Sequence, residues 1–324
     1  MTTSFDPSIP FARAAHSSAN PLGIHAGVWV NDWSPTSARA AIEASARAGF
    51  DLIEIPLPDA SGAAAATAGS DLTRALLDDS GIDAVVSLAL GLDTDINTAD
   101  PAVSARGEQR LLDAVAFASK IGAHYVGGVT FSAMTKYAHP AAEATLANWL
   151  AVLTRVAAAA HEAEVRIGIE YVNRYESNLL NTAAQTAAFI DELQERGAAN
   201  VLLHIDTYHA NIEELCQADA VRDAGQLLGY LHIAESHRGR LGTGTIDWNG
   251  LFVALAASGY KGPLTFESFS SDIISPATVT ISACGGTSGT IRPKWHSTPR
   301  RSCGSISPHP LTVPPLPGPL PVMP

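Results

Sequence analysis

Eight short apolar segments, separated by stretches of helical pattern, constrain this chain more than any other feature. The segments are rich in branched aliphatic side chains, whereas the stretches between them are rich in alanine. The expected strands are Gly23–Val30, Leu52–Leu57, Ala84–Leu90, Tyr125–Thr130, Arg166–Tyr171, Leu202–Asp206, Gly229–Ile233 and Leu264–Glu267. The clearest helical patterns between them are Pro35–Ala48, Ala102–Ile121, Pro140–Ala163, Ala183–Arg196 and Trp248–Ser258. Alternation of this kind predicts consecutive βα units around a parallel sheet.

Eight βα units within about 250 residues fit an α/β fold of the (β/α)8 TIM-barrel type, which forms a single domain. A doubly wound open sheet that binds a nucleotide would carry a glycine-rich phosphate loop after its first strand. The first strand leads instead into Asn31, Asp32 and Trp33. We therefore predict a barrel over residues 22–275, preceded by a flexible N-terminal arm at residues 1–21.

Residues 276–324 break the pattern. More than half of the twenty prolines lie beyond residue 273, and no Asp or Glu does. Such a segment cannot form the long helix that should cover the eighth strand, so we predict an aberrant, non-helical and disordered tail.

A frameshift is a sharper hypothesis for this tail. If the third base of each codon from Ile281 is read with the first two bases of the next, permitted codons spell Leu-Cys-Val-Trp-Arg-Asn-Leu-Trp-Asp-Asp, which resembles the start of an amphipathic helix. The gene sequence tests this hypothesis, because a shifted frame without a helix-like stretch would dismiss it.

Charge and composition argue against several classes of partner. The 20 basic and 32 acidic residues give a formal net charge of -12, which disfavours binding to nucleic acid or to an anionic membrane surface. No apolar run approaches the roughly 20 residues of a membrane-spanning helix, and the N-terminus lacks a signal-peptide pattern. The cysteines, Cys216, Cys284 and Cys303, are spaced too irregularly for a disulfide framework or a thiolate zinc site. We therefore expect a soluble cytoplasmic protein.

Titratable residues gather at the predicted carboxyl ends of the last four strands, where a TIM barrel builds its active site. Each of these strands offers one inward candidate: Glu170, Asp206, His232 and Glu267. Three carboxylates and one imidazole form a hard, oxygen-rich set of ligands that suits Mn2+, Mg2+ or Co2+. A cation would also offset the cost of burying three carboxylates together. Each residue alone has a simpler explanation, as a loop cap or a core histidine, but their joint occurrence favours a metal site.

Other polar and aromatic residues near these strand ends are assigned less specifically. His204 lies two residues before Asp206 and is given a structural role, while Glu235 and His237 are expected in a loop. Four aromatic residues lie at or just after the ends of strands one and four and pack either against a sugar or only against the rim: Trp29, Trp33, Phe131 and Tyr137.

Four segments, in this order, resemble the D-tagatose 3-epimerase / D-allulose (D-psicose) 3-epimerase family of xylose-isomerase-like barrels. The segments are Glu170–Glu176, Asp206–Glu214, His232–Arg238 and Phe266–Ser271. The resemblance spans about residues 22 to 275. Ala234 stands where the family commonly has glycine, and Tyr171 stands where it commonly has valine. The family also normally ends in a Trp-containing helix, which the shifted reading frame would supply.

The resemblance implies a divalent metal ion, Mn2+ or Co2+, held by the residues at the four strand ends: Glu170, Asp206, His232 and Glu267. It further implies that Glu176, His209 and Arg238 hold a ketose around O1 to O3. Homodimers or homotetramers are expected on the same basis.

The function predicted on this basis is metal-dependent epimerisation at C3 of a free ketose of the D-allulose/D-fructose, D-tagatose/D-sorbose or L-ribulose type. The metal ion would polarise the C2 carbonyl. Glu170 and Glu267 would remove and return the C3 proton on opposite faces, through an enediolate. Arg238 and His209 would stabilise negative charge on the oxygens, and Glu176 would orient a hydroxyl group.

Three alternatives stay open at this point. An aldose–ketose isomerase of the xylose-isomerase type, or a hydroxypyruvate-type isomerase, could use the same metal and carboxylates. Metal-dependent hydrolysis of damaged DNA uses the same barrel, but it would need more histidine ligands and a basic surface. A sugar-binding barrel without activity is the third. The intact motifs oppose it, whereas an uncovered eighth strand near Glu267 favours it.

Overall fold

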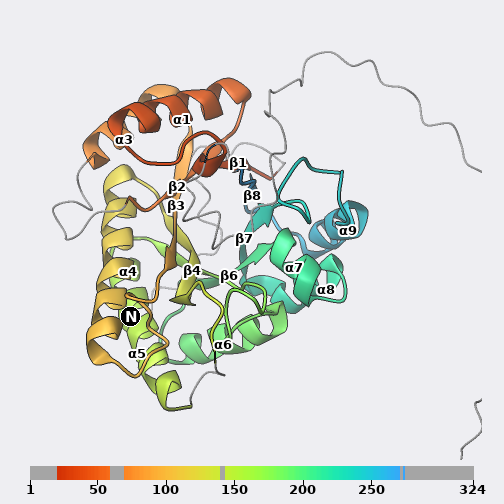
Figure 1. Cartoon of the computed structure of the whole chain (residues 1–324). Coiled ribbons are helices and arrows are strands. Elements are labelled where there is room, and N and C mark those ends of the chain that lie inside the picture. Colours follow the sequence, from red (N-terminus) through yellow and green to blue (C-terminus); the bar gives the residue numbers. More distant parts are fainter. Residues whose placement is uncertain (1–19, 59–68, 139–142, 271–272, 274–324) are drawn as a thin grey trace, which may run out of the picture. The chain divides into compact units, whose positions relative to one another are not determined.

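The computed structural model describes residues 20–58, 69–138, 143–270 and 273 (Figure 1). The predicted tail at 276–324 and most of the predicted arm at 1–21 lie outside these residues. The described chain begins at Asn20, whose side-chain amide donates hydrogen bonds to the carbonyl oxygens of Tyr260 (3.1 Å) and Gly262 (2.9 Å). The residue just before the first strand therefore already contacts the turn that leads into the last strand.

Eight parallel strands form a closed barrel in which each strand pairs with the next along the chain and β8 pairs with β1 (Figure 1). The strands are β1 (Leu22–His25), β2 (Leu52–Pro56), β3 (Asp83–Leu90), β4 (Tyr125–Ala133), β5 (Arg166–Glu170), β6 (Val201–Asp206), β7 (Leu228–Ile233) and β8 (Leu264–Phe266). The prediction of a (β/α)8 TIM barrel is confirmed.

Helices follow the strands and pack on the outside of the barrel. They are α1 (Pro35–Ala48), α3 (Ser70–Ser80), α4 (Pro101–Ile121), α5 (Glu143–Glu162), α6 (Ala183–Glu195), α7 (Thr207–Glu213), α8 (Gln217–Ala224) and α9 (Trp248–Ser258), with short 3-10 turns η2 (Ala26–Val28) and η3 (Gly225–Leu227). Within the described part of the chain, no helix is both long enough and apolar enough to cross a membrane.

Local sequence signals explain where the first helix begins and ends. The Ser34 hydroxyl accepts the backbone N–H of Ser37, and Pro35 occupies the first turn, where a missing N–H costs nothing. Gly49 ends the helix with a φ of 85°, a left-handed conformation that glycine adopts without steric strain. These signals place α1 over the residues that the pattern predicts.

The core has two parts. Aliphatic side chains fill the space between the strands and the surrounding helices, and a second cluster seals the barrel interior at the amino end of the strands: Leu52, Val85, Tyr125 and Tyr230. Gly168 on β5 makes room for this cluster, because a Cβ there would overlap the Tyr125 hydroxyl. Because this cluster fills the barrel at the amino ends of the strands, a site can form only at their carboxyl ends.

The first strand is shorter than predicted. It was expected to continue to Val30, but β1 ends at His25 and the chain turns into η2. The cause is local, since the His25 Nδ1 atom accepts the backbone N–H of Gly27 at 3.0 Å and so caps the turn. The chain therefore turns directly after His25, and the His25 side chain lines the cavity at this end of the barrel.

Candidate active site

The last four strands bring the four predicted metal ligands to one end of the barrel. Glu170 ends β5, Asp206 ends β6, His232 lies in β7, and Glu267 directly follows β8. Strand register sets their level, because Asp206 pairs with His232 across β6 and β7. All four side chains are buried, so the structure places three carboxylates and an imidazole in a low-dielectric interior.

His232 lies at the centre of this group. Its Nδ1 atom is 3.4 Å from a Glu170 oxygen and 3.6 Å from a Glu267 oxygen, so the two carboxylates share one imidazole nitrogen. This nitrogen has no hydrogen-bond partner among the described residues. A buried nitrogen facing two carboxylates calls for either a proton or a cation between them.

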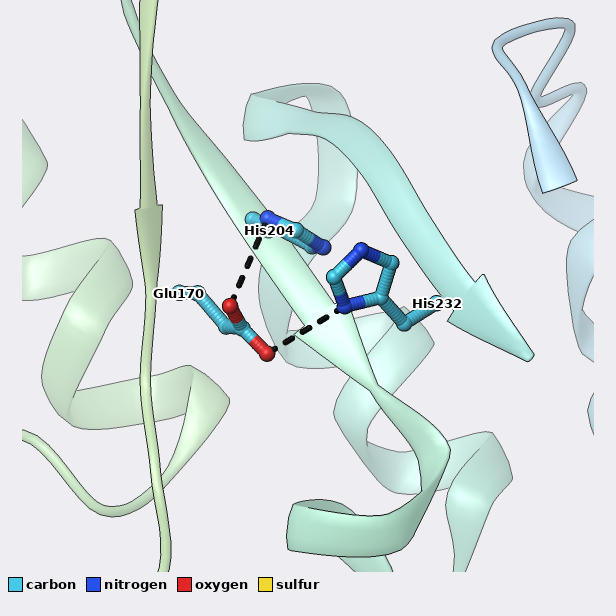
Figure 2. A group of neighbouring side chains, drawn as sticks. All are labelled: Glu170, His204 and His232. Carbon is cyan, nitrogen blue, oxygen red and sulfur yellow. Dashed lines mark ion pairs between the residues drawn. The ribbon is translucent and has the colours of Figure 1, made fainter. Parts of the chain in front are cut away.

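The geometry fits a metal ion. Three overlapping trios each offer ligand atoms that lie within 4.8 Å of one another: Asp206 with His232 and Glu267; Glu170 with His204 and His232; and Glu170 with Asp206 and His209. The Glu170 carboxylate lies between the imidazoles of His204 and His232, at 3.9 and 3.4 Å (Figure 2). Carboxylate oxygens with one or two imidazoles suit Mn2+, Co2+ or Mg2+ better than a thiolate-seeking metal.

The structure adds His204, which we predicted to be structural, to the neighbourhood of this site. It is fully buried, and neither ring nitrogen has a hydrogen-bond partner among the described residues. Its ring packs against that of His232, with centroids 4.2 Å apart. Burial lowers the pKa of His204 well below its usual range, so the ring is neutral.

Arg238 reaches into the carboxylate cluster from the loop after β7. Its Nη1 atom lies 2.7 Å from an Asp206 oxygen and also contacts Glu267. The guanidinium lies over the Tyr208 ring, 4.1 Å from its centroid, and the Ser268 hydroxyl donates a 2.5 Å hydrogen bond to the Arg238 carbonyl oxygen. Arg238 has a φ of 57°, so the packing here holds a non-glycine residue in the left-handed region.

His209 is a neutral donor directed into the site. The backbone N–H of Asn173 donates to the His209 Nδ1 atom at 3.2 Å, which leaves the ring proton on Nε2. This Nε2 atom lies 3.6 Å from an Asp206 oxygen and 3.8 Å from a Glu176 oxygen. Burial, with Arg238 nearby, holds the pKa of His209 well below its usual range.

The carboxylates of the site differ in acidity. Burial raises the pKa of Glu170, raises that of Asp206 to about 8 and raises that of Glu176 to about 7. Burial alone would also raise the pKa of Glu267, but Arg238 and His232 together lower it. One end of the barrel therefore holds carboxyl groups of clearly different proton affinity.

A cavity of about 350 Å3 opens at this end of the barrel. Its lining includes several predicted site residues: Glu170, His209, His232, Arg238 and Glu267. Asp206 and Glu176 are not among the described residues that line it. The volume is at the small end of the range for ligand sites, so it suits a compact molecule such as a monosaccharide.

The four aromatic candidates separate clearly. Trp33 lines the cavity and donates its indole N–H to Thr73 at 3.1 Å. Trp29 instead donates to Ser45 on α1, and Phe131 is fully buried beside Trp149. The Tyr137 hydroxyl donates to Asp95 at 2.6 Å. Of the four, only Trp33 appears in the cavity lining that the described residues form.

Among the residues of the cavity wall that were not predicted, three lie close to the proposed ligands or to one another: His25, Glu54 and Phe269. Glu54 accepts a 2.7 Å hydrogen bond from His232, and Phe269 packs edge-on against His25. Glu54 did carry a signal, because it is a carboxylate in the middle of the apolar strand Leu52–Pro56. It shares the inward face with Leu52 at the two-residue period of a strand.

The expected loop residues do lie in the loop after β7. The buried Glu235 carboxylate accepts the backbone N–H groups of Ser236 (2.9 Å) and Gly242 (2.8 Å), and the indole N–H of Trp248 at 3.2 Å. His237 contacts the Thr243 hydroxyl. Glu235 therefore organises the loop that carries Arg238.

Comparison with known proteins gives a consistent family match. A family model described as xylose isomerase-like TIM barrel matches residues 42–284. An L-ribulose 3-epimerase from Methylomonas sp. is 44% identical over 254 residues, which cover 78% of this chain and 86% of that protein. A ketose 3-epimerase from Arthrobacter globiformis is 42% identical over 255 residues, which cover 79% of this chain and 86% of that protein.

A solved structure agrees with these matches. The crystal structure of a D-allulose 3-epimerase from Methylomonas sp., in complex with D-allulose, superposes with a TM-score of 0.77 at 42% sequence identity. The match covers 82% of this chain and 89% of the other.

Proposed function

The chain belongs to the xylose isomerase-like TIM barrel family and, within it, to the ketose 3-epimerases, which are isomerases; on that premise we propose that it epimerises a free ketose at C3 with the help of a divalent metal ion. The substrates we propose are of the D-allulose/D-fructose, D-tagatose/D-sorbose or L-ribulose type. The observation that carries the proposal is a pair of buried carboxylates, Glu170 and Glu267, both within 3.6 Å of the same nitrogen of His232.

The proposed ligands of the metal ion are Glu170, Asp206, His232 and Glu267. Support comes from the short distances between their ligand atoms and from the buried His232 nitrogen without a hydrogen-bond partner. Mn2+ is our first choice, with Co2+ or Mg2+ as alternatives for the same oxygen-rich set. When bound, such an ion would act as a Lewis acid toward the carbonyl group next to C3.

Glu170 and Glu267 are the proposed acid–base pair. One carboxylate takes the C3 proton on one face, which leaves C3 planar in the enediolate, and the other returns a proton on the opposite face, so C3 of the product has the inverted configuration. Their unequal proton affinities favour such an exchange, because burial raises the pKa of Glu170 while Arg238 and His232 lower that of Glu267. Reversal of direction exchanges the two roles.

Three further residues are proposed to hold the ketose. Arg238 offers a fixed positive charge and His209 a neutral Nε2–H donor, both of which favour negative charge on the oxygens of C1 to C3. Glu176, whose carboxylate oxygen lies 3.8 Å from the Nε2 atom of His209, is proposed to orient a hydroxyl group. Trp33 at the cavity wall would pack against the carbon chain of the sugar.

The chain is also proposed to form a homodimer or a homotetramer in solution. Size-exclusion chromatography with light scattering would measure this, and a monomer would contradict it.

The test of the proposed activity is incubation of metal-stripped protein with D-fructose, D-allulose and D-tagatose, with and without Mn2+. Products would be separated by chromatography. We expect interconversion of C3 epimers that requires the metal and forms no aldose. Aldose formation would instead assign the protein to the aldose–ketose isomerases, and full activity after removal of metal would contradict the metal site.

A further inference from the structure

Glu54 is a carboxylate from the opposite half of the barrel that reaches His232. It lies in the middle of β2, its side chain is inside the barrel, and only 1% of its surface is exposed. One carboxylate oxygen accepts a hydrogen bond from His232 Nε2 at 2.7 Å and a second from the Tyr230 hydroxyl at 3.0 Å. We propose that Glu54 is a positioning residue that fixes the tautomer of His232 and directs its Nδ1 lone pair toward the metal site.

The argument starts from which atoms can donate. An ionised carboxylate only accepts hydrogen bonds, so the nitrogen that faces Glu54 at 2.7 Å carries the proton. In the neutral ring that a metal ion would bind, the lone pair therefore lies on Nδ1, the atom between Glu170 and Glu267. Glu54 therefore determines which nitrogen of His232 is available as a ligand.

Glu54 is itself held in place by hydrogen bonds from residues inside the barrel. The Tyr230 hydroxyl, which donates to Glu54, is also 2.5 Å from the Thr265 hydroxyl. Because Tyr230 uses its own proton on Glu54, Thr265 is the donor in that second contact. A buried chain thus runs from Thr265 through Tyr230 and Glu54 to His232, and every link has one donor and one acceptor.

A merely structural role for this carboxylate is a poor alternative. A buried carboxylate costs several kcal/mol of desolvation, and an apolar side chain of similar size at the same position would avoid that cost. The other oxygen of Glu54 has no hydrogen-bond partner among the described residues, and the His25 Nε2 atom, on a ring whose pKa is lowered by burial, lies 3.9 Å from it. The geometry therefore favours one purpose for this carboxylate, the hydrogen bond to His232.

The inference rests on the proposed metal-dependent function, and its test is a comparison of Mn2+ binding. Isothermal titration of metal-stripped wild type and of the Glu54→Gln variant measures the dissociation constant of Mn2+. We expect the variant to bind about 10- to 100-fold more weakly, the range found when an outer-shell partner of a metal ligand is removed. The amide can donate to His232 Nε2 and so move the ring proton to Nδ1, which removes the ligand lone pair.

A matched pair of tyrosine variants separates positioning from packing. Tyr230 and Tyr125 stack with ring centroids 4.8 Å apart, but only the Tyr230 hydroxyl bonds to Glu54, while that of Tyr125 has no partner among the described residues. We expect Tyr230→Phe to weaken Mn2+ binding several-fold and Tyr125→Phe to leave it unchanged. An equal loss of Mn2+ affinity in both variants would mean that the stacked tyrosines matter only for packing, which would overturn the proposal.

A spectroscopic readout completes the test. In protein labelled with 15N-histidine, the Mg2+-loaded wild type should show a slowly exchanging Nε2–H resonance for His232, which Glu54→Gln should lose or shift. Wild type and Glu54→Gln that bind Mn2+ equally well would overturn the inference while the proposed function stands. A wild type that binds no Mn2+ would instead contradict the proposed function itself.

Discussion

The two halves of this barrel do different work. Strands β5 to β8 present a titratable group at or just beyond each carboxyl end, whereas the cavity wall from β3 and β4 consists of small or apolar residues: Ser87, Leu88, Ala89, Gly128 and Val129. The same repeating unit builds both halves, so the backbone does not explain the difference. Chemistry is concentrated on one side of the axis, and the other side provides shape.

Concentrating carboxylates in one half of the barrel makes them repel one another, and residues from both halves of the barrel contact this group. Three buried carboxylates repel one another in a low-dielectric interior. Arg238, from the same half, offsets this repulsion because its positive charge contacts both Asp206 and Glu267. Two residues of the first half, Glu54 and His25, are directed at the chemistry of the second, through His232 and the cavity wall.

Loss of a proton-transferring carboxylate is the change that should have the largest effect. We expect Glu170→Gln and Glu267→Gln each to lower kcat by about 10²- to 10⁴-fold, the usual contribution of a positioned acid or base. Turnover of D-allulose at saturating Mn2+ measures this, with bound metal quantified in each variant so that lost metal is not mistaken for lost proton transfer. Near-normal turnover in either variant would refute the two-carboxylate scheme.

The Glu176 carboxyl should make stability depend on pH. Burial raises its pKa from 4.5 to about 7, so between these values the folded protein binds a proton that the unfolded chain releases. Its contribution to stability is therefore fully present below pH 4.5 and is lost as the pH rises through 7, by roughly 3 kcal/mol in total. Urea unfolding of metal-stripped protein at several pH values should show a smaller loss in Glu176→Gln than in wild type, because Asp206, whose pKa burial raises to about 8, contributes a loss to both proteins.

Glu235 supplies a control of opposite sign for that experiment. It is equally buried and belongs to the same half, but three backbone N–H groups and Trp248 lower its pKa against the opposing effect of burial. A group with a lowered pKa contributes stability above its usual pKa and loses it as the pH falls. Glu235→Gln should therefore remove stability at neutral pH, and the same pH trend in both variants would contradict the assignment.

Much of this division was visible in the sequence, because it depends on local patterns. Eight apolar runs of strand length predict the barrel, and α1 and α9 begin and end where predicted because their capping residues lie next to them in the chain. The carboxyl ends of the strands share one face of any TIM barrel, so Glu170, Asp206, His232 and Glu267 could be grouped without coordinates.

What the sequence could not supply depends on contacts between distant residues. Glu54 and His232 are 178 residues apart, and only the closed barrel brings them within 2.7 Å. The direction of an aromatic side chain is equally nonlocal. Phe131 lies in β4, but it points outward toward Trp149 in the helical layer and not into the cavity. The early end of β1 arises from one side-chain hydrogen bond, from the Gly27 N–H to His25, which periodicity does not report.

The first half should affect substrate binding more than chemistry, and Trp33 tests this. We expect Trp33→Ala to raise KM about 10-fold with kcat nearly unchanged, the signature of a contact made equally in the ground state and the transition state. Trp29→Ala is a matched control, because both indoles donate to a neighbouring hydroxyl but Trp29 is not part of the described cavity wall. A large fall in kcat for Trp33→Ala would place chemistry in the first half and break the comparison.

The smallest effect should come from a half-buried carboxylate of the first half whose ion-pair partner is exposed to solvent. Glu108 on α4 binds Arg155 on α5 through two contacts of 2.7 Å, but the Arg155 side chain is 56% exposed. An ion pair in water gains little, because water screens the attraction and two flexible side chains must be ordered. We expect Glu108→Gln to change the free energy of unfolding by less than about 1 kcal/mol at low salt, with a smaller change at 1 M salt.

Mn2+ affinity and kcat should match wild type, so this variant is also the reference for Glu170→Gln and Glu267→Gln. A measurable loss of metal binding here would mean that surface charge contributes to the site, and the contrast between the two halves would then be one of degree.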